Sequence, residues 1–456
     1  MQVAVQCSAL QPVELGQPAR CSAQPGSESS FAIKLRKLTL ALVAAMALQW
    51  LCNHVSKFTL SHCSILSPMQ TPTTVDIAIC GAGPVGLALA GLLVQRGMAP
   101  ERIALIDARP LELARADPRS IALSYGTSQI LQKVNAWPIA ASAIAQIHVS
   151  RRGHFGRTLI DCHDYDLPAL GYVTRYGVLV DALSATTDAA GVTALRPATL
   201  TGQNETDEDV ELHLATGQSI RAGIVVQAEG GLFGQQPAKP QSRDYQQTAI
   251  VAQVSVSAPL PHRAFERFTS EGPLALLPQA GHATSGAATH YAMVWCMRPD
   301  TAHRLMQLSE ANFLKALHDA FGGRVGHFVD ISARSTYPLG LNADPAATRR
   351  TVAIGNAAQT LHPVAGQGLN LGMRDAAVLA RLLAREASPA MLQRFLQERR
   401  SDRGMTIRLT DVMARIFASA PDGALSQSLL GLSLGLVDAL PPARRVLAEQ
   451  MMFGRR

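Results

Sequence analysis

VDIAICGAGPVG, at residues 75–86, determines the architecture expected for this 456-residue chain. Its first six residues are mostly apolar and rich in β-branched side chains, which is typical of a buried parallel strand. Gly81 then permits a tight turn, Gly83 lets the backbone approach a pyrophosphate, and Gly86 lets a following helix pack on the strand. The spacing G-x-G-x-x-G after a strand therefore predicts a turn and a helix that bind a dinucleotide.

The residues that follow the glycines support this prediction. An apolar helix is expected after Pro84, which belongs to the predicted cofactor loop, and Gly97 ends that helix. A second strand at residues 102–107 finishes with Asp107, whose carboxylate can accept hydrogen bonds from the adenosine ribose hydroxyls. The N–H groups and dipole of the helix N-terminus favour the phosphates. A glycine-rich turn without a ligand is the alternative, and the motif does not separate FAD from NAD.

A second glycine-rich motif selects the cofactor. A strand at residues 351–355 precedes NAAQTLHPVAGQGLNLGMRD at residues 356–375, and a helix is expected from about residue 369 to 385. This stretch resembles the flavin-side motif of the aromatic-ring flavoprotein monooxygenases. The resemblance implies that FAD is bound by Gly355, Asn356, Pro363, Gly366, Gly368, Leu369 and Asn370. A positive helix end beside the flavin N1–C2=O edge would stabilise the anion of the reduced flavin.

Two further segments match the family between these motifs. Arg119, in DPRSIAL at residues 117–123, is expected to reach the ribityl chain or pyrophosphate of FAD. Glu229 and Gly230 match an acid-Gly pair that the family places near both cofactors. The family usually has Asp where this chain has Glu229, and Asp where it has Asn356. These changes lengthen one side chain and remove one charge near the flavin.

The second motif appears here in a specific variant, NAAQTLHP at residues 356–363, which is similar to the branch that hydroxylates polyprenylated methoxyphenols in ubiquinone biosynthesis. Other segments agree, at residues 119–127, 148–156, 245–252 and 435–444, so the resemblance covers about residues 74–456. It implies an FAD-dependent aromatic-ring monooxygenase that uses NAD(P)H and O2 through a flavin C4a-hydroperoxide. A second G-x-G-x-x-G is not found, so NAD(P)H is expected as a transient co-substrate without a domain of its own.

The expected fold class is α/β: a Rossmann-like FAD-binding domain with an inserted β-sheet substrate domain and C-terminal helices. The FAD-binding domain is predicted to be discontinuous, at residues 74–145, 173–240 and 331–400. Residues 146–172 and 241–330 are predicted to form a β-rich substrate domain, and residues 401–456 a helical region.

A base that removes the phenolic proton would assist the reaction. His362 and Gln367 are the candidate catalytic residues, because both lie in the flavin loop. A histidine in such a loop is more often structural, and the sequence identifies no base securely. Three readings of the function stay open: the hydroxylase described above, a related FAD monooxygenase with another phenolic substrate, and a non-catalytic flavoprotein that scaffolds a biosynthetic complex.

Composition limits the partners and the location. Aromatic residues make up 5% of the chain, which argues against a stacking surface for nucleic acid. The seven cysteines form no C-x-x-C pair, so neither a metal site nor a disulfide framework is predicted, and a reducing cytoplasm is expected. The net charge of +7 and an apolar segment at residues 425–440 would suit peripheral contact with the inner membrane, where a polyprenylated phenol and other ubiquinone-biosynthesis proteins are expected partners.

The first 68 residues differ from the rest of the chain. They hold four of the seven cysteines, and a short apolar run follows three basic residues. That run is short for a membrane-spanning helix, which needs about 20 residues. We interpret residues 1–68 as an atypical extension before a start at Met69; an anchor or a cleaved signal are the alternatives.

Overall fold

The computed structural model describes residues 73–152, 157–230, 239–279, 290–343, 347–363, 366–419 and 441–454. The chain divides into two compact units, residues 1–69 and 70–456. All described residues belong to the second unit. The predictions for residues 1–68 and for the apolar segment 425–440 therefore lie outside the described residues.

A largely parallel sheet carries the first glycine motif. In the described part of the chain it has seven strands. Six follow the order β8-β2-β1-β11-β10-β9, and the seventh, β18, pairs with the C-terminal end of β11. The strands are β1 (Thr73–Cys80), β2 (Ile103–Ile106), β8 (Ala194–Leu195), β9 (Leu200–Glu205), β10 (Val210–Leu214), β11 (Ser219–Gln227) and β18 (Thr351–Ala353). Pairing of β1 with β2 and β11 is parallel, as buried apolar strands predict.

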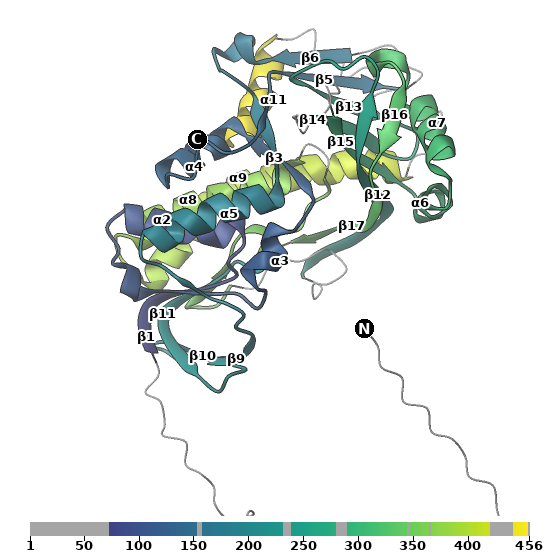
Figure 1. The fold of residues 1–456 in the computed structure, drawn as a ribbon. Helices are drawn as coiled ribbons and strands as arrows, with labels where there is room; N and C mark the ends of the chain where they lie inside the picture. Colours follow the sequence, from purple (N-terminus) through teal and green to yellow (C-terminus); the bar gives the residue numbers. More distant parts are fainter. Residues whose placement is uncertain are drawn as a thin grey trace, which may run out of the picture. The chain divides into compact units, whose positions relative to one another are not determined.

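Helices cover one face of this sheet. Figure 1 shows α2 (Pro84–Gln95), α5 (Tyr176–Ala189) and α8 (Gln367–Leu383) above β1 and β11, and α2 contacts both of the others. Their buried apolar side chains form one core with those of β1 and β11. Gly97 ends α2 as predicted: it has φ +94°, its N–H bonds Val94 O, and the N–H of Met98 bonds Leu93 O. Shorter helices are α3 (Leu111–Arg115) and α4 (Tyr125–Lys133).

A second, mainly antiparallel sheet has eight strands in the described residues, in the order β16-β12-β15-β14-β13-β5-β6, with β17 also paired to β12. They are β5 (Gln146–Arg151), β6 (Arg157–Asp161), β12 (Gln241–Val256), β13 (Arg263–Phe268), β14 (Pro273–Gln279), β15 (His290–Met297), β16 (Phe328–Ile331) and β17 (Ser335–Ala343). Helices α6 (Pro299–Met306) and α7 (Glu310–Phe321) pack on one face, through a core that includes Phe265 and Phe313. The sequence predicted this part as β-rich and did not predict these two helices.

A small sheet and two long helices complete the described elements. The sheet has the order β3-β7-β4, with β3 (Ser120–Ser124), β4 (Ser142–Ile144) and β7 (Gly171–Arg175). The helices are α9 (Pro389–Ser419) and α11 (Pro441–Phe453), and the 3-10 turns are η1 (Pro100–Arg102), η2 (Cys162–Tyr165), η4 (Gly323–Val325) and η5 (Gly355–Ala357). None of the helices in the described ranges is long and apolar enough to cross a membrane.

Strand pairing divides the chain somewhat differently from the predicted domains. β17 pairs with β12 over its whole length, so residues 335–343 belong to the second sheet, although the sequence placed 331–400 in the FAD-binding domain. The hydrogen-bonded pairing of β12 with β17 places these residues in the second sheet, and a single sequence does not show which strands pair. In addition, α9 is one helix across the predicted boundary at residue 400.

Candidate functional site

The first glycine motif forms a tight crossing between the ends of β1 and β11. Gly81 has φ +114°, and a Cβ on it would lie 2.6 Å from Ala228 O and from the backbone nitrogen of Glu229. A Cβ on Gly86 would lie 1.9 Å from Gly81 O. Both positions therefore require glycine, as the motif predicts, and both bring the N-terminus of α2 close to the turn. A close turn of this kind is what the dinucleotide motif predicts for a pyrophosphate site.

Asp107 is fixed beside this turn. It is 7% exposed; its Oδ2 accepts the N–H of Ala82 at 2.7 Å, and its Oδ1 accepts the N–H of Arg109 at 2.8 Å. Each carboxylate oxygen has a second lone pair, so Asp107 can still accept a ribose hydroxyl. Glu229 is exposed, but not fully so. Partial burial raises its pKa, the charge of Asp107 raises it further, and Arg109 opposes the shift. Glu229 and Asp107 thus share one acidic corner of the loop.

Arginines that the sequence analysis did not identify surround the turn. Arg196 donates to Ala82 O at 3.1 Å, and Arg109 lies 3.9 Å from Asp107 Oδ1. A Cβ on Gly83 would lie 3.3 Å from the hydroxyl of Tyr176. Burial raises the pKa of Tyr176, although Arg109 opposes this. The one local signal for Arg109 is its place two residues after the acid of the second strand.

The predicted flavin contact Arg119 has a partner within the protein. Its Nε and a terminal nitrogen donate to the two carboxylate oxygens of Asp117, at 2.9 and 2.6 Å, and its guanidinium lies 5.0 Å from the ring centre of Tyr176. The bond to Asp117 is the main cause of its raised pKa, and Tyr176 and Tyr337 add to it. Arg119 therefore lies at the dinucleotide loop with its charge compensated by Asp117.

The two glycine motifs meet through close backbone contacts. Gly355 has φ +60°, and a Cβ on it would lie 3.2 Å from Val85, which follows Pro84 in α2. A Cβ on Gly372, in α8, would lie 2.9 Å from both Gly355 Cα and Val85 Cγ2. Any larger side chain would separate α2 from α8. The first turn of α2 is therefore held against η5 and against α8, as a single cofactor spanning both motifs would require.

Asn370 fixes the turn before α8. Its Oδ1 accepts the N–H of Ser124 and the hydroxyl of Thr127, each at 2.8 Å, and its Nδ2 donates to Ala122 O and Gly366 O at 3.1 and 2.8 Å. Gly366 has φ +59° and begins the helix. Because these four bonds use the amide on the protein itself, Asn370 positions the turn that carries Gly366. Of the other predicted residues here, Gln367 is buried, Gly368, Leu369 and Pro363 are partly buried, and Asn356 is exposed.

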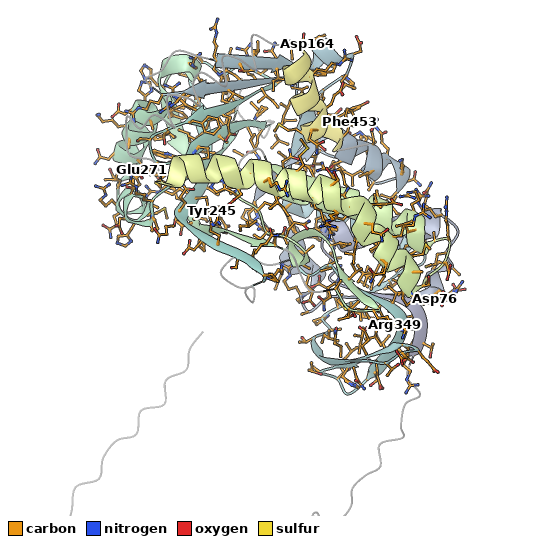
Figure 2. All side chains as sticks on the ribbon, turned by 180° about the vertical axis from the view of Figure 1, so that it is seen from behind. Asp76, Asp164, Tyr245, Glu271, Arg349 and Phe453 are labelled. Atoms are coloured by element: carbon orange, nitrogen blue, oxygen red, sulfur yellow. The ribbon has the colours of Figure 1, made fainter. Side chains whose placement is uncertain are left out.

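His362 joins the flavin loop to the second sheet. It is 1% exposed, and its Nε2 lies 3.0 Å from Gln247 Oε1, which can only accept; Nε2 therefore carries the proton. A bulge in β12, with Gln246 at φ +52°, accompanies this contact, and the neighbouring Tyr245 ring stacks edge-on at 5.5 Å. Figure 2 shows Tyr245 beside α9, where its hydroxyl bonds Asp411 at 2.9 Å. Burial lowers the pKa of His362 to about 4, so these contacts favour a structural role.

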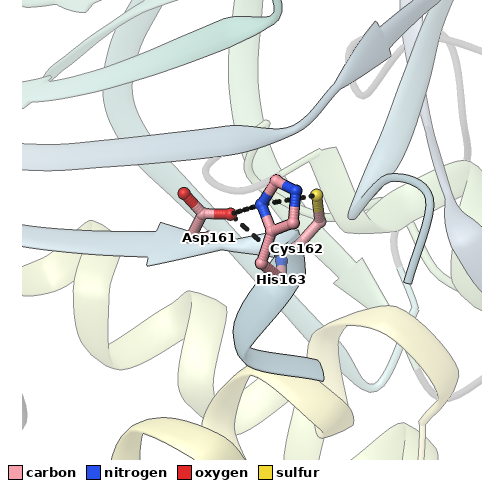
Figure 3. Close-up of side chains that lie close together, drawn as sticks. All are labelled: Asp161, Cys162 and His163. Carbon is pink, nitrogen blue, oxygen red and sulfur yellow. Dashed lines mark hydrogen bonds and ion pairs between the residues drawn. The ribbon is translucent and has the colours of Figure 1, made fainter. Parts of the chain in front are cut away.

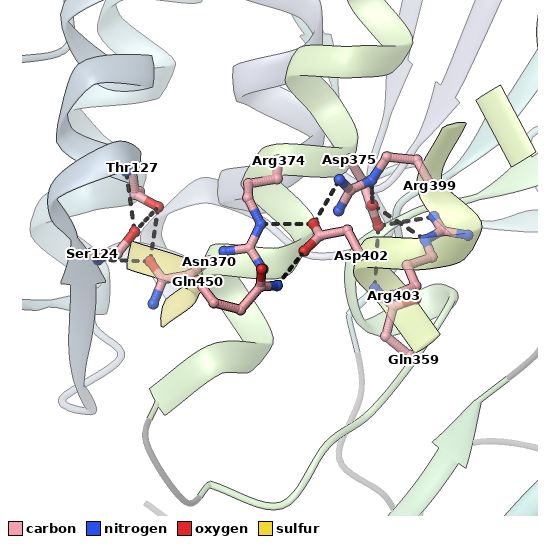
Figure 4. A network of polar contacts seen from close by, with 10 residues as sticks. All are labelled: Ser124, Thr127, Gln359, Asn370, Arg374, Asp375, Arg399, Asp402, Arg403 and Gln450. Carbon is pink, nitrogen blue, oxygen red and sulfur yellow. Dashed lines mark hydrogen bonds and ion pairs between the residues drawn. The ribbon is translucent and has the colours of Figure 1, made fainter. Parts of the chain in front are cut away.

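A buried ion network supports α8 behind the flavin loop (Figure 4). Asp375 is fully buried and accepts hydrogen bonds from Arg399, Arg403 and Gln359. Arg403 also donates to Ala353 O at the end of β18, so α9 holds both arms of the second motif. Arg374 pairs with Asp402, which in turn accepts from Arg399 and from Gln450 of α11. The sequence analysis did not identify this network, whose charged members lie on α8 and α9 and whose glutamines lie on α11 and in the segment after η5.

One group of residue types that can bind metals is present among the described residues: Asp161, Cys162 and His163 (Figure 3). Asp161 begins η2, and its Oδ1 accepts both the N–H and Nδ1 of His163, at 3.0 and 2.6 Å. Gln146 is the first cause of the lowered pKa of Asp161, about 2. These bonds describe a capped turn at the end of β6, which accounts for the cluster without a metal.

Comparison with known proteins places the chain in a family. Residues 74–407 match the FAD binding domain family. The chain is 31% identical to an uncharacterised protein of Synechocystis sp., with 84% of this chain and 94% of that protein covered. It is 30% identical to the ubiquinone hydroxylase UbiL of Rhodospirillum rubrum, with 83% and 89% covered. The crystal structure of p-nitrophenol 4-monooxygenase PnpA from Pseudomonas putida shares the fold, with a TM-score of 0.64, 15% identity, and 84% and 99% covered.

Proposed function

The chain belongs to the FAD-dependent monooxygenase family that includes the ubiquinone hydroxylases, and we propose that it hydroxylates the ring of a polyprenylated methoxyphenol in ubiquinone biosynthesis. Within this family the motif at residues 356–363 resembles that of 2-polyprenyl-6-methoxyphenol hydroxylase. The contact of Gly355 and Gly372 with Val85 is the observation that carries the proposal, because it joins two cofactor motifs into one site.

The residues fit FAD at each end of that site. The turn at Gly81 and the N-terminus of α2 would hold the pyrophosphate, and Asp107 the adenosine ribose. Gly366 and the N-terminus of α8 would hold the isoalloxazine edge. Bound FAD, once reduced by NAD(P)H, supplies activated oxygen to the ring.

The protein's part is to orient the ring and exclude water. The bonds of Asn370 fix the turn before α8, and those of His362 hold the flavin loop to the second sheet. The ring would be held between that loop and the sheet, where few polar groups compete with it. The apolar tail leads us to propose that the substrate is collected at a membrane surface, with other proteins of the same biosynthesis as partners.

Isotope labelling tests the proposal. The full-length chain, loaded with FAD, receives NADPH, a short-tailed 2-prenyl-6-methoxyphenol and ¹⁸O2, and the product is weighed. We expect a ring-hydroxylated product with one ¹⁸O atom. If NADPH is consumed and only hydrogen peroxide forms, across several methoxyphenols, the proposed substrate is wrong.

A further inference from the structure

One row of residues crosses the second sheet with partly accessible side chains. Cross-strand register aligns Val149 of β5, Glu266 of β13, Ala275 of β14, Val294 of β15 and Val251 of β12. All five are intermediate in exposure. The row is therefore a band of small apolar side chains, with a single carboxylate, that the protein leaves partly uncovered.

This band lies on the face away from α6 and α7. Side chains alternate along a strand, and Phe265 and Arg267, on either side of Glu266, point to α7: Phe265 joins its core, and Arg267 donates to Ala320 O. Glu266 and Ala264 thus share the opposite face. There Ala264 packs with Val173 of the small sheet.

Two contacts link that face to the flavin loop and its surroundings. Gln279, in β14, donates a hydrogen bond to Ser120 of β3. Ala122 in the same strand lies next to Gly366, since a Cβ on Gly366 would be 3.3 Å from it. Gln247, in β12, bonds His362. The side of the sheet that carries Glu266 therefore looks toward the turn that begins α8.

Tyr337 supplies an independent link between the two sides. It pairs with Ala249, which pairs with Cys296, two residues from Val294 in the band. Tyr337 also adds to the raised pKa of Arg119, after the larger effect of Asp117. Tyr337 thus connects the strands of the band with the segment that carries Arg119.

The Glu266 carboxylate is unusual on this wall. Among the described residues it has neither a hydrogen-bond nor an ion-pair partner. Burial raises its pKa to about 7. The other ionisable groups on the same face include Arg151 of β5, His290 and Cys296 of β15, Asp330 of β16 and Tyr337 of β17, and burial followed by Glu266 raises the pKa of Cys296. A carboxylate that is partly withdrawn from water and has no partner is costly to keep unless it has a function.

We propose that the band binds the phenol ring and that Glu266 is the catalytic residue that accepts the phenolic proton; this rests on the proposed function. The phenolic O–H bond breaks, the proton forms an O–H bond with the carboxylate, and the electron pair stays on the phenolic oxygen. That pair enriches the ring carbon that takes one atom of O2. NAD(P)H supplies the two electrons with which the other atom becomes water, and the ring C–H proton is released to solvent.

The test compares Glu266→Gln and Glu266→Asp with the wild-type holoenzyme. Gln keeps the shape and removes the base, whereas Asp keeps a carboxylate. Glu211→Gln, on β10 of the first sheet, is the matched control. Each variant is assayed for bound FAD, for anaerobic flavin reduction by NADPH, and for hydroxylated product per NADPH from pH 5 to 10. The substrates are a short-tailed methoxyphenol and its methyl ether, which has no proton to lose.

We expect Glu266→Gln to bind FAD and to be reduced normally but to lose about 10²- to 10³-fold in hydroxylation of the phenol. The fall in hydroxylation rate toward acid pH, expected near pH 7 in the wild type, should be absent from this variant. Its activity should return at alkaline pH, because the phenol then ionises without a base. Glu266→Asp should regain part of the rate, and the methyl ether should react alike in all variants. If the wild type forms product and Glu266→Gln keeps the same pH profile, the role of Glu266 is wrong and the proposed function stands. No product from the wild type overturns the proposed function and this role together.

Discussion

Replacement of Asp375 by Asn should lower the free energy of unfolding by about 3–5 kcal/mol. Asp375 is fully buried, and its two oxygens accept four hydrogen bonds: Oδ1 from Arg399 and Arg403, and Oδ2 from Arg403 and Gln359. An amide can replace one oxygen only by presenting N–H groups to two donors. Two buried donors would lose their acceptor at about 1–3 kcal/mol each, which agrees with the cost of breaking a buried ion pair.

Denaturant unfolding of the two holoenzymes measures this loss, with Asp319→Asn as the control. Asp319 pairs with Lys315 on the surface, with 55% of its side chain exposed, so its variant should unfold like the wild type. Burial alone would raise the pKa of Asp375, but Arg403 and Arg399 outweigh it and lower that pKa. Its stabilisation is therefore present above the unfolded pKa and lost as pH falls through the folded value. A loss below about 1 kcal/mol, or the same acid sensitivity in Asp375→Asn, would refute the reasoning.

Three further predictions concern the loops. Gly86→Ala should abolish FAD retention, measured by flavin absorbance after gel filtration, because its Cβ would meet Gly81 O at 1.9 Å; Gly404→Ala, with open space around it, should retain FAD. The pKa of His362 falls from 6.5 to about 4 on folding, so the unfolded chain binds a proton at a higher pH than the folded chain does. The free energy of unfolding should therefore drop by a few kcal/mol as the pH falls from 6.5 to about 4. His362→Gln should flatten that slope in denaturant titrations, and an unchanged slope would exclude His362 as its source. Asn370→Ala removes four bonds and should weaken FAD affinity and raise peroxide formation per NADPH; tight coupling would contradict its positioning role.

The sequence predicted the parts of the fold whose signals are local. The strand, turn and helix at residues 73–95 follow from apolar periodicity and glycine spacing, and Gly86 packs as the motif requires. The helix after the second motif begins at Gln367, two residues before its expected start. FAD as cofactor and the monooxygenase family were also predicted, and the comparisons confirm both. These features depend on neighbours in the chain.

Non-local pairing explains what the sequence did not reveal. Glu266 stands in RAFERF, where alternation separates two faces but does not say which face meets the flavin loop. Only the register of β5, β13, β14, β15 and β12 places it in a row of small apolar residues. The partners of Asp375 lie 16 to 28 residues away on other elements, so no spacing rule identifies them.

Departures from the family pattern are easier to understand once main-chain and side-chain roles are separated. At the acid-Gly segment, the backbone nitrogen of Glu229 is the atom 2.6 Å from a Cβ on Gly81. The position therefore shapes the turn through its main chain, which Asp and Glu share. The side chain lies near Asp107: partial burial is the main cause of the raised pKa of Glu229, and the charge of Asp107 adds to it. A longer side chain can move its charge away from Asp107 without disturbing the turn, so the change from Asp to Glu preserves the main-chain geometry at Gly81.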